Sequence, residues 1–233
     1  MKTIGMIGGL AWPSTVTFYR TINEEIARRL GDEGSHSADL VLSQVDFHEV
    51  ERCQARGDWD RVAELIGRQA AALKAAGADF YFIACNTVHT VFDRITGYTD
   101  LPCLHIVDPV GSYAVQKGLS VVGLMGSRYT MDGDYFTGRL QDKYGLRVLV
   151  PSESVREKID CALYGELTRG IVSEETREVF RQCVAELADA GAQLIILGCT
   201  EYGLAVDPEE SPVPVIDTAV ALAKAAVNYA LAE

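Results

Sequence analysis

YFIACNT (residues 81–87) places Cys85 and two polar residues directly after an apolar run, and LIILGCT (194–200) repeats this arrangement around Cys199. One buried cysteine is ordinary, because free cysteine is among the most buried residue types. Two cysteines at matching positions indicate an internal repeat. Two further pairs of segments match in the same order: TIGMIGG (3–9) with VVGLMGS (121–127), and HIVDPV (105–110) with PVIDTA (214–219). The ordered set predicts a duplicated unit.

Short apolar runs alternate with amphipathic stretches along the whole chain. The predicted strands are Thr3–Ile7, Leu40–Val45, Phe80–Ala84, Leu104–Val107, Ser120–Met125, Arg147–Val150, Leu194–Leu197 and Val213–Ile216. The predicted helices are Ser14–Leu30, Trp59–Ala76, Thr87–Ile95, Pro109–Lys117, Met131–Tyr144, Glu153–Thr168, Glu174–Ala190 and Thr218–Leu231. Apolar strands without polar alternation, separated by helices, indicate parallel sheets that are covered on both faces.

The fold class predicted from this pattern is α/β, with two pseudo-symmetric lobes that each contain a parallel sheet flanked by helices. Residues 1–98 and 213–233 are expected to form the first lobe, and residues 99–212 the second. Open α/β sheets bind ligands at the carboxyl ends of their strands. We therefore expect the active site in the cleft between the lobes, with Cys85 and Cys199 facing each other across it.

Composition narrows the class of partner. The chain has 233 residues, 48% of them apolar, and its 21 basic and 33 acidic residues give a net charge of −12. This charge argues against nucleic acid or an anionic membrane as the main partner. No apolar run approaches the roughly 18 residues of a membrane-spanning helix, and the first residues read as a strand rather than a signal peptide. Six cysteines without a CxxC pair favour reduced thiols in the cytoplasm and no metal site.

Two opposed thiols suit racemisation at a carbon acid. One thiolate removes the α-proton from one face of the substrate, and the other thiol returns a proton to the opposite face. A free cysteine titrates at about 8.5, and a helix that begins after it lowers that value; a helix is expected after both Cys85 and Cys199. The resulting carbanion needs hydrogen-bond donors aimed at the substrate carboxylate. The candidate donors are Asn86, Thr87, Thr130, Thr200 and nearby backbone amides.

Three motifs resemble those of the aspartate/glutamate racemase family. IGMIGGLAWPSTVTFYRTIN (4–23) is similar to the family's opening glycine turn and first helix, ACNTVH (84–89) to its first cysteine motif, and LGCTEYGL (197–204) to its second. The resemblance extends over essentially the whole chain. It implies an amino-acid racemase that needs no pyridoxal phosphate or other cofactor, with a small amino acid as its substrate and a homodimer as its assembly.

The resemblance also implies roles for individual residues. Cys85 and Cys199 would be the acid/base pair, and the residues that hold the substrate would be Leu10, Asn86, Thr87, Thr200 and Glu201. Aspartate-specific members of the family carry an arginine after the second strand and a lysine on a helix of the second lobe. This sequence departs from that pattern at both places. Aspartate, glutamate and a less acidic amino acid therefore all stay open, and the candidates for contact with the substrate side chain are His48, Gln54 and Arg169.

Several polar positions also have a simpler interpretation. His89 is as well explained by a helix-face or capping role as by contact with substrate. Glu201 either hydrogen-bonds near the thiol or only favours a helix start by its charge. Asp108 and Asp217 are predicted to be helix N-caps. The remaining cysteines are expected to be packing residues: Cys53, Cys103, Cys161 and Cys183.

Two alternatives to a racemase remain at this level. One is another cysteine enzyme acting on a small carboxylate, either a decarboxylase or a cis–trans isomerase. The other is a two-lobed protein that binds an amino acid without chemistry. The pair of mirrored thiols favours the racemase, because a binding protein needs donors but no base on each face of its ligand.

Overall fold

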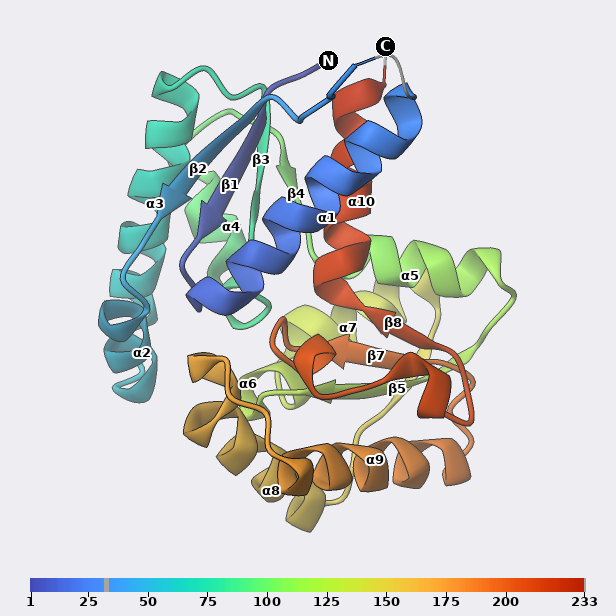
Figure 1. Ribbon diagram of the computed structural model, residues 1–233. Coiled ribbons are helices and arrows are strands. Elements are labelled where there is room, and N and C mark those ends of the chain that lie inside the picture. Colours follow the sequence, from blue (N-terminus) through green and yellow to red (C-terminus); the bar gives the residue numbers. More distant parts are fainter. Residues whose placement is uncertain (32–33, 233) are drawn as a thin grey trace. The chain divides into compact units, whose positions relative to one another are not determined.

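The computed structural model describes residues 1–31 and 34–232 (Figure 1). It consists of two compact units. Unit 1 comprises Met1–Ile106 and Ala219–Glu233, and unit 2 comprises Val107–Thr218. The chain thus passes from unit 1 to unit 2 once and returns once, and each unit is described separately below.

Unit 1 contains a four-stranded sheet in the order β2-β1-β3-β4. Its strands are β1 (Ile4–Gly8), β2 (Leu40–Gln44), β3 (Phe80–Ile83) and β4 (Cys103–Leu104), and all neighbours are parallel. Its helices are α1 (Trp12–Leu30), α2 (Phe47–Ala55), α3 (Trp59–Ala75), the short 3-10 helix η1 (Thr87–Val91), α4 (Phe92–Thr96) and most of α10 (Thr218–Leu231).

Strand β3 shows why this sheet is apolar on both faces. Phe80 contacts Tyr229 of α10 at 4.5 Å between ring centroids, and Phe82 contacts Phe18 of α1 at 5.3 Å. The alternate residues Tyr81 and Ile83 belong to the core cluster that α3 covers. Figure 1 shows α1 and α10 on one side of the sheet and α3 on the other. Successive strand residues point to opposite faces, so two-sided covering requires the continuous apolar run.

Unit 2 repeats this topology, with a parallel sheet in the order β6-β5-β7-β8. Its strands are β5 (Val121–Gly126), β6 (Arg147–Leu149), β7 (Ile195–Gly198) and β8 (Val215–Asp217). Its helices are α5 (Val107–Gln116), α6 (Arg128–Met131), α7 (Asp134–Tyr144), α8 (Glu153–Gly165), η2 (Leu167–Arg169), α9 (Glu174–Asp189), η3 (Tyr202–Leu204) and η4 (Pro208–Glu210). In both units the first strand lies between the second and the third. The α/β class with two parallel sheets is confirmed.

The unit boundaries differ from the predicted ones. The prediction ended the first lobe's main segment at residue 98 and began its return at residue 213, but the units meet at 106/107 and 218/219. The reason is strand pairing. β4 pairs with β3 of unit 1 through Tyr81 and Cys103, and β8 pairs with β7 of unit 2 through Ile195 and Val215. Each crossing therefore follows the last strand of a sheet rather than preceding it.

Several local elements also differ from the predictions. Helix α2 was not predicted; the Asp46 side chain caps it by accepting a hydrogen bond from the His48 amide. The helix expected over Met131–Tyr144 is divided into α6 and α7. Asp108 is not an N-cap, because it lies inside the first turn of α5 and pairs with Arg139 of α7 at 2.7 Å.

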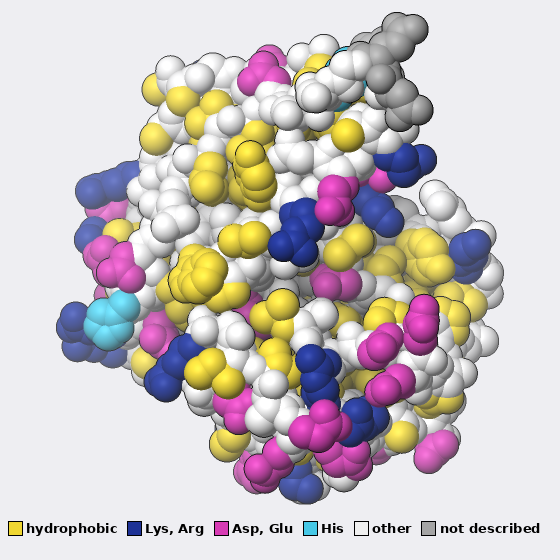
Figure 2. Space-filling model, in the orientation of Figure 1, with side chains coloured by type: hydrophobic (Ala, Val, Ile, Leu, Met, Phe, Trp, Pro, Cys, Tyr) yellow, Lys and Arg dark blue, Asp and Glu magenta, His cyan; other side chains and the backbone are white. Residues whose placement is uncertain are grey.

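Charged side chains of both signs are interspersed on the face in Figure 2. Arg181 of α9, for example, pairs with Glu174, Glu178 and Glu210 at 2.5–3.5 Å. Exposed pairs of this kind contribute little to stability individually. Within residues 1–31 and 34–232, no helix combines the length and the apolar content that a membrane crossing requires.

Candidate active site

Cys85 lies just beyond the carboxyl end of β3, in unit 1. The Ala84 amide donates to the Ile7 carbonyl at 2.9 Å, which extends the pairing of β3 with β1 by one residue. The chain then turns, and the Cys85 side chain is only 7% exposed. We call residues 84–89 the Cys85 turn. Its position at a strand end agrees with the sequence prediction.

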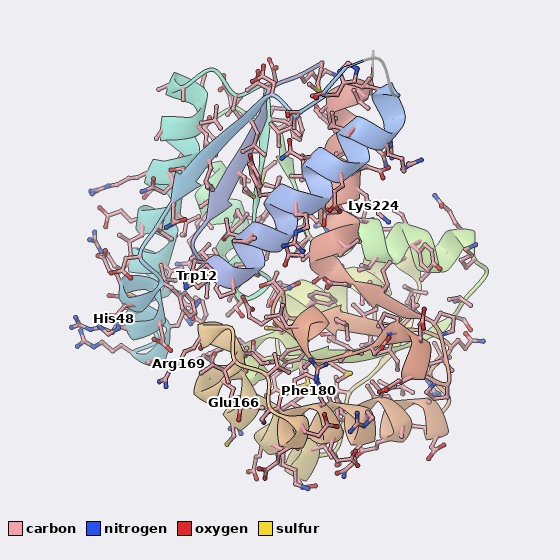
Figure 3. The ribbon with its side chains drawn as sticks, viewed as in Figure 1. Trp12, His48, Glu166, Arg169, Phe180 and Lys224 are labelled. Atoms are coloured by element: carbon pink, nitrogen blue, oxygen red, sulfur yellow. The ribbon has the colours of Figure 1, made fainter. Side chains whose placement is uncertain are left out.

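The turn after β1 lies at the same edge of this sheet. Gly9 has a φ of +83°, and a Cβ there would lie 2.3 Å from the Val45 carbonyl oxygen. Its amide donates to Thr15 Oγ1 at 2.8 Å, so α1 holds the turn in place. Leu10 follows, is buried, and packs in the same apolar cluster as Cys85. Trp12, the first residue of α1, is 60% exposed (Figure 3).

His89 uses both of its ring nitrogens inside unit 1. Nδ1 lies 2.8 Å from the Cys85 carbonyl oxygen, and Nε2 accepts a hydrogen bond from the Ile106 amide at 3.3 Å. The imidazole is buried and stacks on Phe92. Of the two roles considered for His89, the structure supports the local one. Asn86, on the same turn, is also buried, and Thr87 opens η1.

The two unit 1 candidates for contact with a substrate side chain lie differently on α2. Gln54 is 5% exposed, and its Nε2 has no hydrogen-bond partner among the residues that the structure describes. His48 is exposed, and Figure 3 shows it at the outer end of α2. An unpaired buried amide costs free energy, so Gln54 is the stronger candidate for a ligand contact.

Cys199 occupies the corresponding place in unit 2, directly after β7, and is 8% exposed. Its Sγ donates to Glu201 Oε2 at 3.2 Å, and Thr200 Oγ1 donates to the same oxygen at 2.8 Å. Glu201 is itself buried. We call residues 198–203 the Cys199 turn. The interpretation that Glu201 hydrogen-bonds the thiol is confirmed.

Thr130 lies behind the strand ends of unit 2. It is fully buried, and its Oγ1 is 2.8 Å from Tyr135 Oη and 3.3 Å from Ser127 Oγ. A Cβ at Gly126 or Gly198 would meet its side chain within 2.8–3.1 Å. The sequence predicted Thr130 as a donor but missed Tyr135, which follows only five residues later and had no repeat partner to mark it.

Arg169 lies on the segment between α8 and α9 (Figure 3). Glu166 fixes this segment by accepting hydrogen bonds from the Ser173 amide, Ser173 Oγ and Thr176 Oγ1 at 2.8–3.1 Å. Arg169 is exposed, and it forms no ion pair with any carboxylate of residues 1–31 and 34–232. Thr168 precedes it on η2 and is half-buried.

The helical segment predicted after Cys85, Thr87–Ile95, is divided into a 3-10 helix and an α-helix, and only a short 3-10 helix follows Cys199. Cys85 is followed by the five residues of η1 and the five of α4, and Cys199 only by the three residues of η3. Because the helix dipole sums over aligned peptide units, turns this short contribute little. These short elements therefore add no support to the expectation that a helix start lowers the thiol pKa. Next to the Cys199 thiol, the Glu201 carboxylate accepts its hydrogen bond at 3.2 Å.

Of the other four cysteines, Cys53 packs partly buried against the unit 1 core cluster, and the remaining three fall into two groups. Burial raises the pKa of Cys103 and of Cys183 to about 12, so both remain thiols at neutral pH and behave as packing residues. Cys161 is exposed on α8, which corrects the prediction that it packs. Within the described part of the chain, no three His, Cys, Asp or Glu side chains are grouped as metal ligands would be.

Each unit thus carries a buried thiol at the carboxyl end of the third strand of its sheet. Asn86 and Thr87 accompany Cys85, and Thr200 and Glu201 accompany Cys199. Chemically, such a thiol can take or give one proton, and the neighbouring hydroxyl, amide and backbone groups can hold a carboxylate.

The chain is similar in sequence and in structure to known racemases. A provisionally named Asp/Glu racemase from Yersinia pestis is 43% identical in sequence; the match covers 100% of both chains with a TM-score of 0.91. The glutamate racemase of Roseiflexus sp. is 30% identical over 178 residues, 75% of this chain and 62% of that protein. The broad specificity amino-acid racemase RacX of Bacillus subtilis is 24% identical over 175 residues, 75% of each chain.

The sequence match spans less than two thirds of the length of three glutamate racemases, from Pseudomonas entomophila, Herpetosiphon aurantiacus and Roseiflexus sp.. The sequence model of the Asp/Glu/Hydantoin racemase family matches residues 7–226. That match includes both cysteine turns and both sheets from the end of β1 onward. The chain belongs to the Asp/Glu/hydantoin racemase family.

Proposed function

We propose that this protein is a cofactor-independent amino-acid racemase in which Cys85 and Cys199 are the two acid/base groups. The observation that carries this proposal is their equivalence: each thiol follows the third strand of one of two sheets with the same strand order. Racemisation treats the two faces of one carbon alike, so it needs one proton-transferring group for each face. A duplicated unit supplies two such groups within one chain.

The reaction balances without a redox partner. The thiolate of one cysteine takes the α-proton and forms an S–H bond, while the C–H electron pair moves into a carbanion stabilised by the substrate carboxylate. The other thiol then gives its proton to the opposite face, and the S–H electron pair stays on that sulfur. The two cysteines have exchanged protonation states, and solvent restores them. For the mirror-image substrate the order is reversed.

Neighbouring residues have distinct parts in this scheme. Glu201 accepts the Cys199 S–H and can hold its proton, because the two atoms are already within hydrogen-bond distance at 3.2 Å. Asn86, Thr87 and Thr200 are the donors to the substrate carboxylate, and Leu10 contributes an apolar contact. Thr130, a candidate donor by sequence, is assigned instead to packing against the unit 2 strand ends, because it is fully buried beside Gly126 and Gly198 and its hydroxyl is close to Tyr135.

The substrate class is a small amino acid, of which aspartate and glutamate are the first to test. The names of the relatives, glutamate racemase and broad specificity amino-acid racemase, support this range. Arg169 and Gln54 are the proposed contacts for a second carboxylate. Arg169 is exposed and has no ion pair within the described chain, and Gln54 Nε2 is buried and unpartnered there.

The decisive test is exchange of the α-proton in D₂O without added cofactor, followed by NMR on single enantiomers. The unmodified protein should racemise its substrate and wash deuterium into both enantiomers. Cys85→Ala and Cys199→Ala should each abolish racemisation, because every turnover uses both thiols. Each variant should still wash deuterium into one enantiomer, a different one in the two cases, since exchange needs only the thiolate on the proton's own face.

Cys53→Ala and Cys161→Ala are matched controls, because these thiols lie on α2 and α8 rather than after a strand. Both should racemise normally. Near-normal racemisation by Cys85→Ala or Cys199→Ala would overturn the two-base mechanism. Release of CO₂ would indicate a decarboxylase instead, and binding of an amino acid without any exchange would indicate a binding protein.

A further inference from the structure

His89 is a buried titratable residue that takes no part in the proposed proton transfers. Its two ring nitrogens contact backbone groups that are far apart in sequence, the Cys85 carbonyl at 2.8 Å and the Ile106 amide at 3.3 Å. An amide can only donate, so Nε2 must be its unprotonated acceptor. The ring proton then resides on Nδ1 and is donated to the Cys85 carbonyl. The imidazole is therefore neutral and fixed in one tautomer.

The two groups that His89 joins have special places in the chain. Cys85 carries one of the two proposed reacting thiols, and Ile106 is the last residue of unit 1 before the chain passes into unit 2. The ring is held by Phe92, stacked at 5.4 Å between centroids, and by His105, edge-on at 4.7 Å. Neighbouring aromatic rings on two sides restrict its rotation.

Where the chain returns from unit 2 to unit 1, a buried side chain of unit 2 forms a comparable hydrogen bond. Thr218 is the last residue of that unit, is fully buried, and donates from Oγ1 to the Leu197 carbonyl at 2.7 Å. Leu197 lies in β7, two residues before Cys199. At both crossings, one buried side chain thus connects the end of the unit to the strand end that carries a cysteine.

We infer that His89 is the positioning residue of the Cys85 turn: its neutral imidazole fixes this turn against Ile106, at the point where the chain leaves unit 1. The expected effect on catalysis rests on the proposed function, in which a displaced Cys85 thiol would transfer protons more slowly. His89 itself is not proposed to contact the substrate. A displacement of about 1 Å at a reacting group can cost on the order of a hundredfold in rate.

The test uses His89→Leu, which replaces the imidazole with an apolar side chain of similar reach and so removes both hydrogen bonds. In D₂O, deuterium wash-in through Cys85 should fall about tenfold or more, while wash-in through Cys199 stays within about twofold. The enantiomer that each thiol serves is assigned with Cys85→Ala and Cys199→Ala. A purely structural role would lower both rates together, so equal losses on the two faces would overturn the inference.

Two partial replacements separate the two hydrogen bonds. His89→Asn keeps a donor near the position of Nδ1 and should restore much of the Cys85 wash-in. His89→Gln keeps an acceptor near the position of Nε2 and should restore the melting temperature more than the Cys85 wash-in. Thr218→Val is the matched control. It removes the hydrogen bond from Thr218 to the Leu197 carbonyl and should leave the wash-in rate through Cys85 within about twofold. If His89→Asn restores no more Cys85 wash-in than His89→Gln, the inference is wrong.

A second readout does not depend on racemase activity. Alkylation by iodoacetamide, followed by peptide mass spectrometry, measures the Cys85 rate with Cys199 as an internal reference, because the two thiols are similarly buried at 7% and 8% exposed. His89→Leu should raise the ratio of the Cys85 rate to the Cys199 rate at least about threefold, as the loosened turn exposes its thiol. A ratio that does not rise would overturn the positioning role, whether or not the unmodified protein exchanges any α-proton.

Discussion

The two proposed reacting thiols have different surroundings, although their backbones are equivalent. Cys199 donates to a buried carboxylate two residues along the chain, whereas the carbonyl of Cys85 is held by an imidazole four residues along. Glu201 offers the Cys199 proton a second acceptor, and His89 in its neutral form holds the Cys85 turn. The pH dependence of proton abstraction is therefore expected to differ between the two enantiomers. Where the thiols titrate as a pair, the observed pKa values belong to the pair.

Substrate choice is decided at the residue scale, and Arg169 is its proposed determinant. Arg169→Ala should lower kcat/KM for an acidic amino acid by about tenfold or more and change that for a neutral one little, because a charge-assisted bond to a carboxylate contributes roughly 1.5–3 kcal/mol. Steady-state assays of kcat/KM with acidic and with neutral amino acids measure this difference. Arg147→Ala is the control, since Arg147 is an exposed arginine at the amino end of β6. Equal effects on acidic and neutral substrates would exclude Arg169 as the clamp.

At the scale of elements, the turn between β1 and α1 depends on glycine. Gly9→Ala should destabilise the protein by about 3 kcal/mol, because the left-handed φ of +83° costs roughly 1–2 kcal/mol and the new Cβ would collide with the Val45 carbonyl. Gly77→Ala has a similar φ of +92° but open space around it, and should cost about 1 kcal/mol. Urea denaturation compares the two. Similar losses of stability in the two variants would show that the backbone at Val45 moves aside without a cost in free energy.

The pairing of α5 with α7 predicts a dependence of stability on pH. Burial alone would raise the pKa of Asp108, but hydrogen bonds from Arg139, Lys143 and Tyr144 outweigh it and lower this pKa to about 2. Because the folded value lies below the unfolded value of 3.8, the stabilisation is present above about pH 4 and is lost as pH falls toward 2.

Asp108→Asn should therefore lower the free energy of unfolding at pH 6 by about 1–2 kcal/mol, a value reduced for partial exposure of the pair. The difference from the unmodified protein should shrink as pH falls below 4, as urea denaturation at several pH values would measure. Asp142→Asn, which changes an exposed carboxylate on α7, the helix that carries Arg139, should show little difference at any pH. A pH-independent loss for Asp108→Asn would mean that packing rather than charge is affected.

The whole molecule contains the duplicated unit within one chain, so the proposed site needs no residue from a second copy. Co-expression of differently tagged Cys85→Ala and Cys199→Ala chains, followed by isolation of any mixed assembly, tests this. If both thiols of a site belong to one chain, the mixed assembly should not racemise, even where the protein is the expected homodimer. Racemase activity in the mixed assembly would place the two thiols of a site on different chains. Each variant purified alone serves as the control.

The sequence by itself determined the features that depend on local patterns. A run such as Phe80–Ile83 must be buried on both sides, which requires a parallel sheet with helices on each face. The ordered pairs of segments required two copies of one topology, and each cysteine fell at a strand end because its apolar run stops just before it. The motifs around Cys85 and Cys199, together with the opening glycine turn, identified the family that the comparisons show.

Only the tertiary structure decided which sheet the short strands join and how the polar side chains are used. β4 has two residues and β8 has three, too few for any periodic signal, so their pairing and the unit boundaries follow from contacts with distant strands. Contacts made by the folded chain also decide three features of single side chains: the hydrogen bond of His89 with Ile106, the closeness of Thr130 to Tyr135, and the burial of Gln54. Packing determines these hydrogen-bond partners, because a buried polar group bonds to the donors and acceptors that the fold places next to it.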